Sequence, residues 1–150
     1  MELYNNIFIE TEKNIVESDL LEIEENLKFK FPNDIKRHYL FYNGGYPERY
    51  VFRKNDKLYV VQEFLPIKYG AQGCLFEDTF IALKKEKKIL PDYLIPFAIN
   101  PGGDYYCFSI NENELGAIYI FFGEFDDPKR SIIFLSISLK DFVMEMIEEE

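Results

Sequence analysis

The segment from Ile95 to Ile110 restricts the possible folds more than any other part of the sequence. Two apolar runs flank Pro101-Gly102-Gly103-Asp104, where the chain must turn. Glycine adopts positive φ without steric cost and lets another backbone approach closely, so Gly102 and Gly103 predict a tight turn. We therefore expect two neighbouring strands whose connection presents Asp104 at the rim of a sheet.

The length and composition predict a single domain spanning residues 1–150. A chain of 150 residues with 47% hydrophobic residues can bury a substantial core. Aromatic residues make up 17% of the chain, as 15 Phe and 11 Tyr without any Trp. Aromatic rings fit pleated, half-buried surfaces, so this composition favours an interior rich in sheet.

Helical periodicity and capping residues predict two helices near the N-terminus. After a polar start that we expect to be frayed, Ser18 or Asp19 can cap the first helix. Pro32 suits the first position of the second helix. Asn43-Gly44-Gly45 can end that helix, because glycine adopts the left-handed cap conformation.

Two further helices follow from apolar stripes. One carries Phe76, Phe80 and Leu83 on a shared face, and the lysines from Lys84 to Lys88 are expected to be its solvated end. The last helix begins with Ser138 as its N-cap. Together these patterns predict about four helices.

Strand patterns occupy most of the remaining chain. Tyr50 to Val61 has the pattern of a hairpin. Four short apolar runs then follow, joined by loops too short for helical crossovers, so they predict an antiparallel meander. These runs are Leu94–Ile99, Tyr105–Ile110, Ala117–Phe122 and Ile132–Ile137.

The charge balance restricts the kind of partner. The formal net charge of -10 produces a negative field that attracts basic proteins and repels nucleic acid and anionic membranes. An equally simple interpretation is that the charge serves only solubility. The start of the chain lacks a signal peptide pattern, and no segment reaches the length of a bilayer span, so we expect a cytoplasmic protein.

The residues that usually perform catalysis or bind metals are sparse. Cys74 and Cys107 lie far apart and lack the Cys-x-x-Cys spacing, so neither a disulfide nor a zinc site is predicted. The best case for an enzyme is a Cys74 nucleophile at a helix start, assisted by the single histidine, His38. His38 lies on an apolar stripe, however, where a core histidine is the simpler interpretation. We therefore expect no enzyme activity, cofactor or metal.

Several short motifs, taken together and in order, resemble the SUKH superfamily, which is named after the yeast Smi/Knr cell-wall assembly regulators. They span most of the chain, from about Ser18 to the final helix. They are Leu20, Glu24, Leu27, Phe31-Pro32, Ile35, Tyr39, Asn43-Gly44-Gly45, Ile95-Pro96-Phe97-Ala98, Gly103-Asp104-Tyr105, Gly116 and Ile118-Tyr119.

The resemblance implies a fold and two possible functions. The fold is an α+β domain with a curved, mostly antiparallel sheet of about five to six strands flanked by about four helices. Bacterial members are mostly immunity proteins that bind and block the toxin of their own system, often a nuclease or deaminase. Fungal members instead look like scaffolds that regulate cell-wall glucan synthesis. The hairpin at Tyr50–Val61 and the loop Lys68–Gly73 carry little of the family signature, so partner specificity is expected to differ there.

Acidic loops and tyrosines form the predicted partner-binding set, because acidic residues attract a basic toxin domain and Tyr anchors protein contacts. No binding to nucleic acid or membrane is expected, and the chain can be a monomer or a homodimer. The predicted contacts are Tyr46, Tyr50, Tyr69, Asp104, Tyr105, Tyr106, Glu112, Glu114, Glu124, Asp126 and Asp127.

Other residues of the motifs have a structural interpretation beside the functional one. Asp104 either binds a partner's Lys or Arg or closes its own turn, and the local role is favoured. Glu24 is expected to make a structural hydrogen bond or ion pair near the second helix, because a partly buried carboxylate needs a partner. The full structural set is Glu24, Pro32, Asn43, Gly44, Gly45, Gly102 and Gly103.

Overall fold

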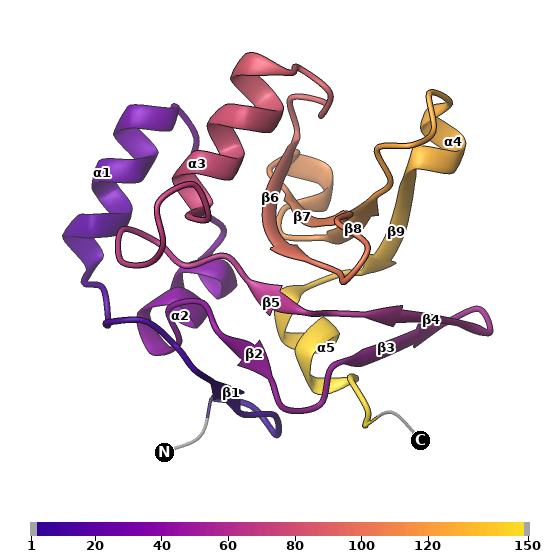
Figure 1. Cartoon of the computed structure of the whole chain (residues 1–150), viewed down its shortest axis with the longest axis horizontal. Helices are drawn as coiled ribbons and strands as arrows, with labels where there is room; N and C mark the ends of the chain where they lie inside the picture. Colours follow the sequence, from indigo (N-terminus) through magenta and orange to yellow (C-terminus); the bar gives the residue numbers. More distant parts are fainter. Residues whose placement is uncertain (1–2, 149–150) are drawn as a thin grey trace.

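The computed structural model describes residues 3–148, and it is an α+β fold built around a curved antiparallel sheet (Figure 1). The sheet has the order β5-β6-β7-β8-β9, and two separate pairs, β1-β2 and β3-β4, flank it. The strands of the sheet are β5 (Glu63–Phe64), β6 (Leu94–Ile99), β7 (Tyr105–Ser109), β8 (Ile118–Phe121) and β9 (Ile132–Ser136).

Helices cover the inner face of the sheet (Figure 1). Phe76 and Phe142 come from two of these helices, and their rings contact Phe108 and Tyr106 of β7 respectively. The outer face carries a smaller apolar cluster that includes Leu94, Cys107 and Tyr119. The helices are α1 (Glu17–Leu27), α2 (Asn33–Phe41), α3 (Phe76–Phe80), α4 (Pro128–Ser131) and α5 (Leu139–Met144).

The predicted meander and hairpin are confirmed. Each strand from β6 to β9 pairs antiparallel with its neighbour along the chain. The hairpin consists of β3 (Val51–Lys54) and β4 (Lys57–Val60). In Figure 1 it points to the right, below β9. Its turn residues Asn55 and Asp56 both have positive φ, which is the geometry that a two-residue hairpin turn requires.

The expectation of a frayed N-terminal start is wrong. Residues 3–16, here called the strap, bury Tyr4, Asn6, Phe8 and Ile15 against the body of the protein. Within the strap, β1 (Phe8–Ile9) pairs antiparallel with β2 (Tyr46–Pro47). Strands of this length are too short to show an alternating pattern, so the sequence carries no signal for them.

Two predicted helix ends are also corrected. α1 begins before Ser18, and Asp19 caps it from inside the first turn by accepting a hydrogen bond from Val16 N–H at 2.9 Å. Pro32 is the N-cap of α2 rather than its first residue. The C-cap of α2 is Tyr42 in an extended conformation, so the two glycines that follow it belong to the path into β2.

The third predicted helix is confirmed, but it continues as a π-helical stretch from Ile81 to Glu86. Lys84 is not the solvated lysine we expected. Its Nζ donates to the backbone carbonyls of Pro91, Asp92 and Leu94 at 2.9, 3.1 and 2.9 Å, and burial lowers its pKa. Within residues 3–148, no helix combines the length and apolar character needed to span a bilayer.

Candidate protein-binding surfaces

A buried asparagine, Asn43, links three segments of the N-terminal half. The Asn43 side chain has no exposed surface and uses both ends of its amide. Nδ2 donates to the carbonyls of Lys13 and Ile67, both at 2.9 Å, and Oδ1 accepts from Ile67 N–H at 2.7 Å. Asn43 thus joins the strap, the end of α2 and the segment after β5.

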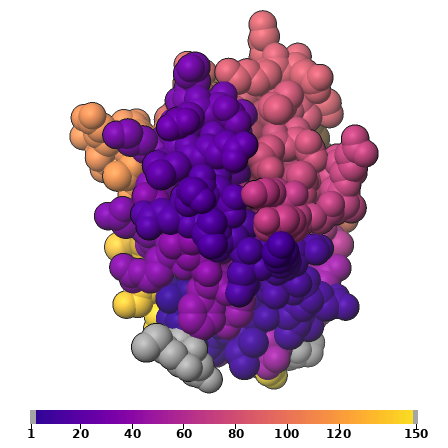
Figure 2. All heavy atoms as spheres, turned by 90° about the vertical axis from the view of Figure 1, so that its left-hand side faces the viewer, coloured from indigo at the N-terminus to yellow at the C-terminus, as the bar shows by residue number. Residues whose placement is uncertain are grey.

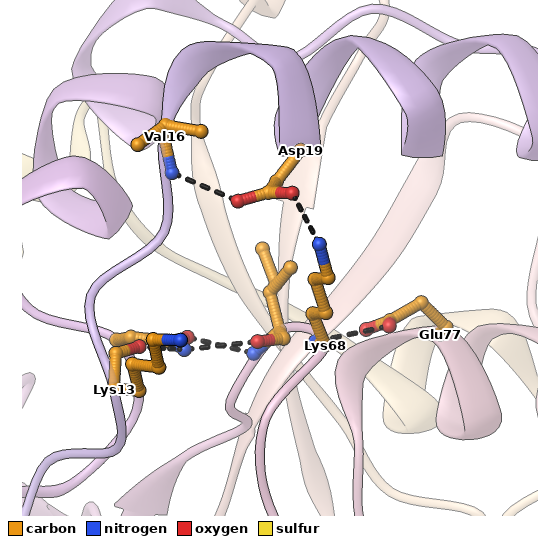
Figure 3. A network of polar contacts seen from close by, with 7 residues as sticks. Lys13, Val16, Asp19, Lys68 and Glu77 are labelled. Atoms are coloured by element: carbon orange, nitrogen blue, oxygen red, sulfur yellow. Dashed lines mark hydrogen bonds and ion pairs between the residues drawn. The ribbon is translucent and has the colours of Figure 1, made fainter.

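A second set of contacts links α1 to the loop beside α3 (Figure 3). Lys68 Nζ donates to Asp19 Oδ1 at 2.8 Å, and Lys68 N–H donates to Glu77 Oε2 at 3.0 Å. The hydrogen bond from Lys68, followed by that from Val16 N–H, lowers the pKa of the Asp19 carboxyl. Burial raises the pKa of Glu77. These contacts fix the position of α1 relative to the core.

The strap and α1 lie together on one side of the molecule (Figure 2). Five exposed carboxylates of these two segments make this side acidic, and we call it the acidic face. Two large apolar side chains lie exposed within it, with Val16 60% and Leu21 49% exposed. Aliphatic groups surrounded by carboxylates suit a partner that is basic and partly apolar. The exposed carboxylates are Glu10, Glu12, Glu17, Glu22 and Glu25.

A second surface lies between the hairpin and the end of the sheet at which β6 connects to β7, and we call it the hairpin groove. It consists of two cavities of about 480 and 380 Å³, which share Val60 and Pro101 in their walls. The first cavity is lined by β4 and by Tyr106 and Ile120 of the sheet. The second lies between β2 and the end of β4, where Tyr46 and Tyr50 line it.

The structure disperses the predicted tyrosine contacts. Tyr46 and Tyr50 share the hairpin groove, whereas Tyr69 lies against the ammonium groups of Lys13 and Lys68 near the acidic face. Tyr105 is partly exposed and packs against the outer apolar cluster. Tyr106 has no exposed surface, and its hydroxyl donates to Val60 C=O at 2.7 Å. The expected partner contact through the Tyr106 side chain is therefore corrected to a structural role.

The predicted acidic loops do not form one patch. In an antiparallel meander, successive connections alternate between the two ends of the sheet. Glu112 and Glu114 lie in the β7–β8 connection, and therefore at the opposite end of the sheet from Glu124, Asp126 and Asp127 in the β8–β9 connection. Some of these carboxylates also bond locally, because Asp127 accepts from Lys129 N–H and Glu114 accepts from the Tyr119 hydroxyl.

Asp104 closes its own turn, as the favoured interpretation had it. Its N–H donates to Asn100 Oδ1 at 2.7 Å, and Asn100 Nδ2 donates back to Asp104 Oδ2 at 3.2 Å. Gly103 has the positive φ, 87°, that the turn requires, whereas Gly102 does not share it. Asp104 lies in the β6–β7 connection, at the same end of the sheet as Glu124.

The structural role expected for Glu24 is confirmed. Its Oε2 accepts a hydrogen bond from Phe31 N–H at 2.8 Å, just before α2 begins. Gly44 and Gly45 both have positive φ and lie in close contact with other segments. A Cβ on Gly45 would lie 2.5 Å from the carbonyl oxygen of Ile9, so this position admits only glycine.

The thiol and imidazole considered for catalysis do not share a site. Cys74 is exposed, whereas His38 is fully buried among Tyr4, Phe8 and Phe64. The Tyr4 hydroxyl bonds to His38 Nδ1 at 3.0 Å, and burial lowers the pKa of His38 to about 3. Within the described residues, no group of three or more His, Cys, Asp or Glu residues could hold a metal ion.

A protein-family model for the SMI1 / KNR4 family (SUKH-1) matches residues 14–145 of the chain. The match covers α1, the hairpin and the whole five-stranded sheet. This protein belongs to the SMI1/KNR4 family, SUKH-1. Among curated proteins, none matches the chain.

Both candidate surfaces of this SUKH-1 domain contain residues that sequence reasoning missed. On the acidic face, Glu17, Leu21 and Glu25 recur every four residues, which was a readable sign of one exposed helix face. In the hairpin groove, Leu58 is 57% exposed beside the cavity. The sequence carried no sign that Leu58 would be exposed, because an apolar residue in a strand normally indicates burial.

Proposed function

We propose that this SUKH-1 domain is a non-enzymatic immunity protein that neutralises a cognate toxin domain by binding it in the cytoplasm. The observation that carries the proposal is the acidic face, where Val16 and Leu21 stand exposed among five exposed carboxylates. Exposed aliphatic groups supply contact energy, and the surrounding carboxylates select a basic partner. Membership of the SUKH-1 family adds support, because the bacterial members that the sequence resembles are mostly immunity proteins.

The expected mechanism is coverage of the toxin without any turnover. The net charge of -10 accelerates encounter with a basic domain, such as a nuclease or deaminase that itself binds nucleic acid. The ion pair between Asp19 and Lys68 helps to hold α1 against the core, so less backbone ordering is needed when the face binds a partner. A complex that covers the toxin's active site or holds an inactive shape then blocks its activity.

The test begins with the toxin-like chain encoded beside this protein. Co-purification of the two chains and rescue of growth in cells that express the toxin are the expected results. A neighbour that is not a toxin, or that fails to bind, would contradict the proposal. Binding instead to an enzyme of cell-envelope synthesis would support the regulatory function found in fungal members of the family.

Two charge-reversal variants decide which acidic surface meets the toxin. Glu17→Lys with Glu25→Lys changes the acidic face, and Glu124→Lys with Asp126→Lys makes the same change in net charge on the β8–β9 loop. We expect the first pair to lower the association rate by about tenfold or more and the second to have a small effect. The reverse result would assign the interface to the loop.

A further inference from the structure

The outer edge of β4 lies along the hairpin groove, and among residues 3–148 no strand pairs with it. Val61 N–H donates to Tyr50 C=O at 2.8 Å. In β4 and the residue after it, the backbone N–H and C=O groups of the odd-numbered residues therefore face β3. Backbone groups alternate along a strand, so those of Leu58 and Val60 face the other way. The bond from the Tyr106 hydroxyl to Val60 C=O confirms this direction.

The sheet itself leaves this edge open. Gln62 N–H donates to Ile99 C=O at 2.8 Å, so the residues just after β4 pair with β6. β6 ends at Ile99, and the chain then turns away through Asn100 and Pro101. The line that β6 would have followed beside β4 is occupied by the larger cavity of the groove, about 480 Å³.

The other edge of the same hairpin already carries an added strand residue. Val51 N–H donates to Ile147 C=O at 3.1 Å, and Ile147 N–H donates to Val51 C=O at 2.8 Å. The C-terminal segment of the chain thus pairs antiparallel with β3. The hairpin is therefore geometrically suited to accept an extended segment on an edge.

The charges at the tip of the hairpin determine what kind of segment fits. Arg53, Lys54 and Lys57 lie there, and Asp56 is the one carboxylate between Val51 and Val60. Lys57 lines the cavity directly, and Lys54 Nζ lies 5.0 Å from the ring centre of Phe134. On a protein with a net charge of -10, this is a local positive rim.

We propose that the hairpin groove binds an extended acidic peptide segment of a protein partner, which adds as an antiparallel strand to the outer edge of β4. The segment follows the line of β6, so it runs from Pro101 towards Lys57, and its C-terminal residues carry the carboxylates. Leu58 N–H, Leu58 C=O and Val60 N–H supply the backbone bonds. Alternate side chains of the segment pack on Leu58, Ile120 and Phe122 along the cavity. This site is separate from the acidic face and does not depend on the immunity function.

The first experiment uses an amidated peptide of about six residues, alternating valine and threonine and ending in two glutamates. NMR titration should shift the amide signals of Leu58 and Val60. The same peptide ending in two lysines should bind about tenfold more weakly, because its charges meet the positive rim. N-methylation of the amides that face β4 should abolish binding. Equal binding of the acidic and basic peptides, or unchanged Leu58 and Val60 signals, would overturn the proposal.

Variants of the protein separate backbone pairing from side-chain contact. Leu58→Pro removes the outward N–H and leaves the ladder to β3 in place, whereas Leu58→Ala keeps the N–H and removes the exposed side chain. We expect the proline variant to bind the acidic peptide about tenfold more weakly than the alanine variant. Equal affinities would contradict strand pairing.

Charge variants and self-association provide the remaining controls. Lys57→Glu should weaken acidic-peptide binding by about tenfold, while Lys30→Glu, an exposed lysine outside the groove, should not. If the wild-type protein dimerises in sedimentation experiments and Leu58→Pro abolishes the dimer, the occupant is a second copy of this chain, and the acidic-peptide proposal is wrong.

Discussion

Two turns that look alike in the sequence have opposite surroundings in the structure. Asn43-Gly44-Gly45 and Asn100-Pro101-Gly102-Gly103 each place an asparagine before glycines. Asn43 is fully buried and bonds to two distant segments, whereas Asn100 is partly exposed and bonds only within its own turn. The same arrangement of an asparagine before glycines thus links separate segments in the core at Asn43, and it forms part of the wall of the hairpin groove at Asn100.

The difference shows where this fold needs rigidity and where it leaves surface available. At the buried turn, the N–H of Ile67 cannot reach water, so the Asn43 side chain must satisfy it. At the exposed turn, water can replace any bond that is lost. Paired substitutions at equivalent positions of the two turns therefore measure how much burial adds to the same motif.

The largest effect is expected at the two asparagines. Asn43→Ala leaves the buried N–H of Ile67 without its partner and removes one donor each from the carbonyls of Lys13 and Ile67. The Ile67 carbonyl keeps the bond from Tyr69 N–H. We expect a loss of about 3–5 kcal/mol in the free energy of unfolding, measured by urea denaturation. Asn100→Ala should cost about 1 kcal/mol or less. Similar losses for the two variants would show that burial does not distinguish the turns.

The next effect concerns two glycines with nearly the same φ. Gly45 has φ 88° and Gly103 has φ 87°, so alanine is strained by a positive φ at both positions. A Cβ at Gly45 meets Ile9 C=O at 2.5 Å, whereas a Cβ at Gly103 meets no atom within 4 Å. Gly103→Ala should cost about 1 kcal/mol, and Gly45→Ala should cost about 2–4 kcal/mol, because the strap must also move. Equal unfolding free energies for the two alanine variants would mean that the strap can move away from residue 45 without loss of stability.

The sequence allowed the strands of the meander and the hairpin to be predicted because each is long enough to show an apolar pattern. It could not reveal whether an Asn-Gly turn is buried, since that depends on the strap crossing over it. Tyr105 and Tyr106 illustrate the same limit. They are adjacent and alternate between the two faces of the sheet, and only the tertiary structure shows that Tyr106 faces inward.

The candidate surfaces were predictable only in part. The alternation of connections in a meander was sufficient to separate Glu112 from Glu124, once the meander itself was expected. The free edge of β4 was not predictable, because it results from β6 ending at Ile99 while the run from β4 to β5 continues past it. Such an edge is a property of strand lengths in space rather than of any one segment.

Acidification should destabilise the region of the buried Asn43 turn, because His38 lies in α2, the helix that leads into this turn. Burial lowers the pKa of His38 to about 3, whereas the unfolded chain has a pKa near 6.5, so the folded state disfavours the proton. The contribution of neutral His38 to the free energy of unfolding is therefore fully present above pH 6.5. It falls by about 1.4 kcal/mol per pH unit as the pH decreases from 6.5 towards 3. Urea unfolding between pH 7 and pH 5 measures this slope.

The control for this prediction is His38→Gln, which keeps a polar group near the Tyr4 hydroxyl and does not titrate. It should remove most of the slope between pH 7 and pH 5. Hydrogen exchange should show that the Asn43 turn, which follows α2, loses protection on acidification before the hairpin does. A slope that persists in the glutamine variant would assign it to carboxylates instead.

The smallest effect is expected at the ion pair that links α1 to the loop near the buried turn. The Asp19 side chain is 10% exposed and Lys68 is 48% exposed, so solvent screens the pair on the lysine side. Lys68→Met removes the ion pair but leaves the bond from Val16 N–H to Asp19, whereas Asp19→Ala removes both. We expect Asp19→Ala to lower the melting temperature more than Lys68→Met. High salt should bring wild type closer to both variants, because both lack the ion pair, and should leave the difference between the two variants nearly unchanged. Because the folded state lowers the pKa of Asp19, its contribution should persist at neutral pH and disappear as the pH falls below the carboxyl's ordinary value of 3.8. A Lys68→Met variant as unstable as Asp19→Ala would show that the ammonium group, rather than the helix cap, holds α1 in place.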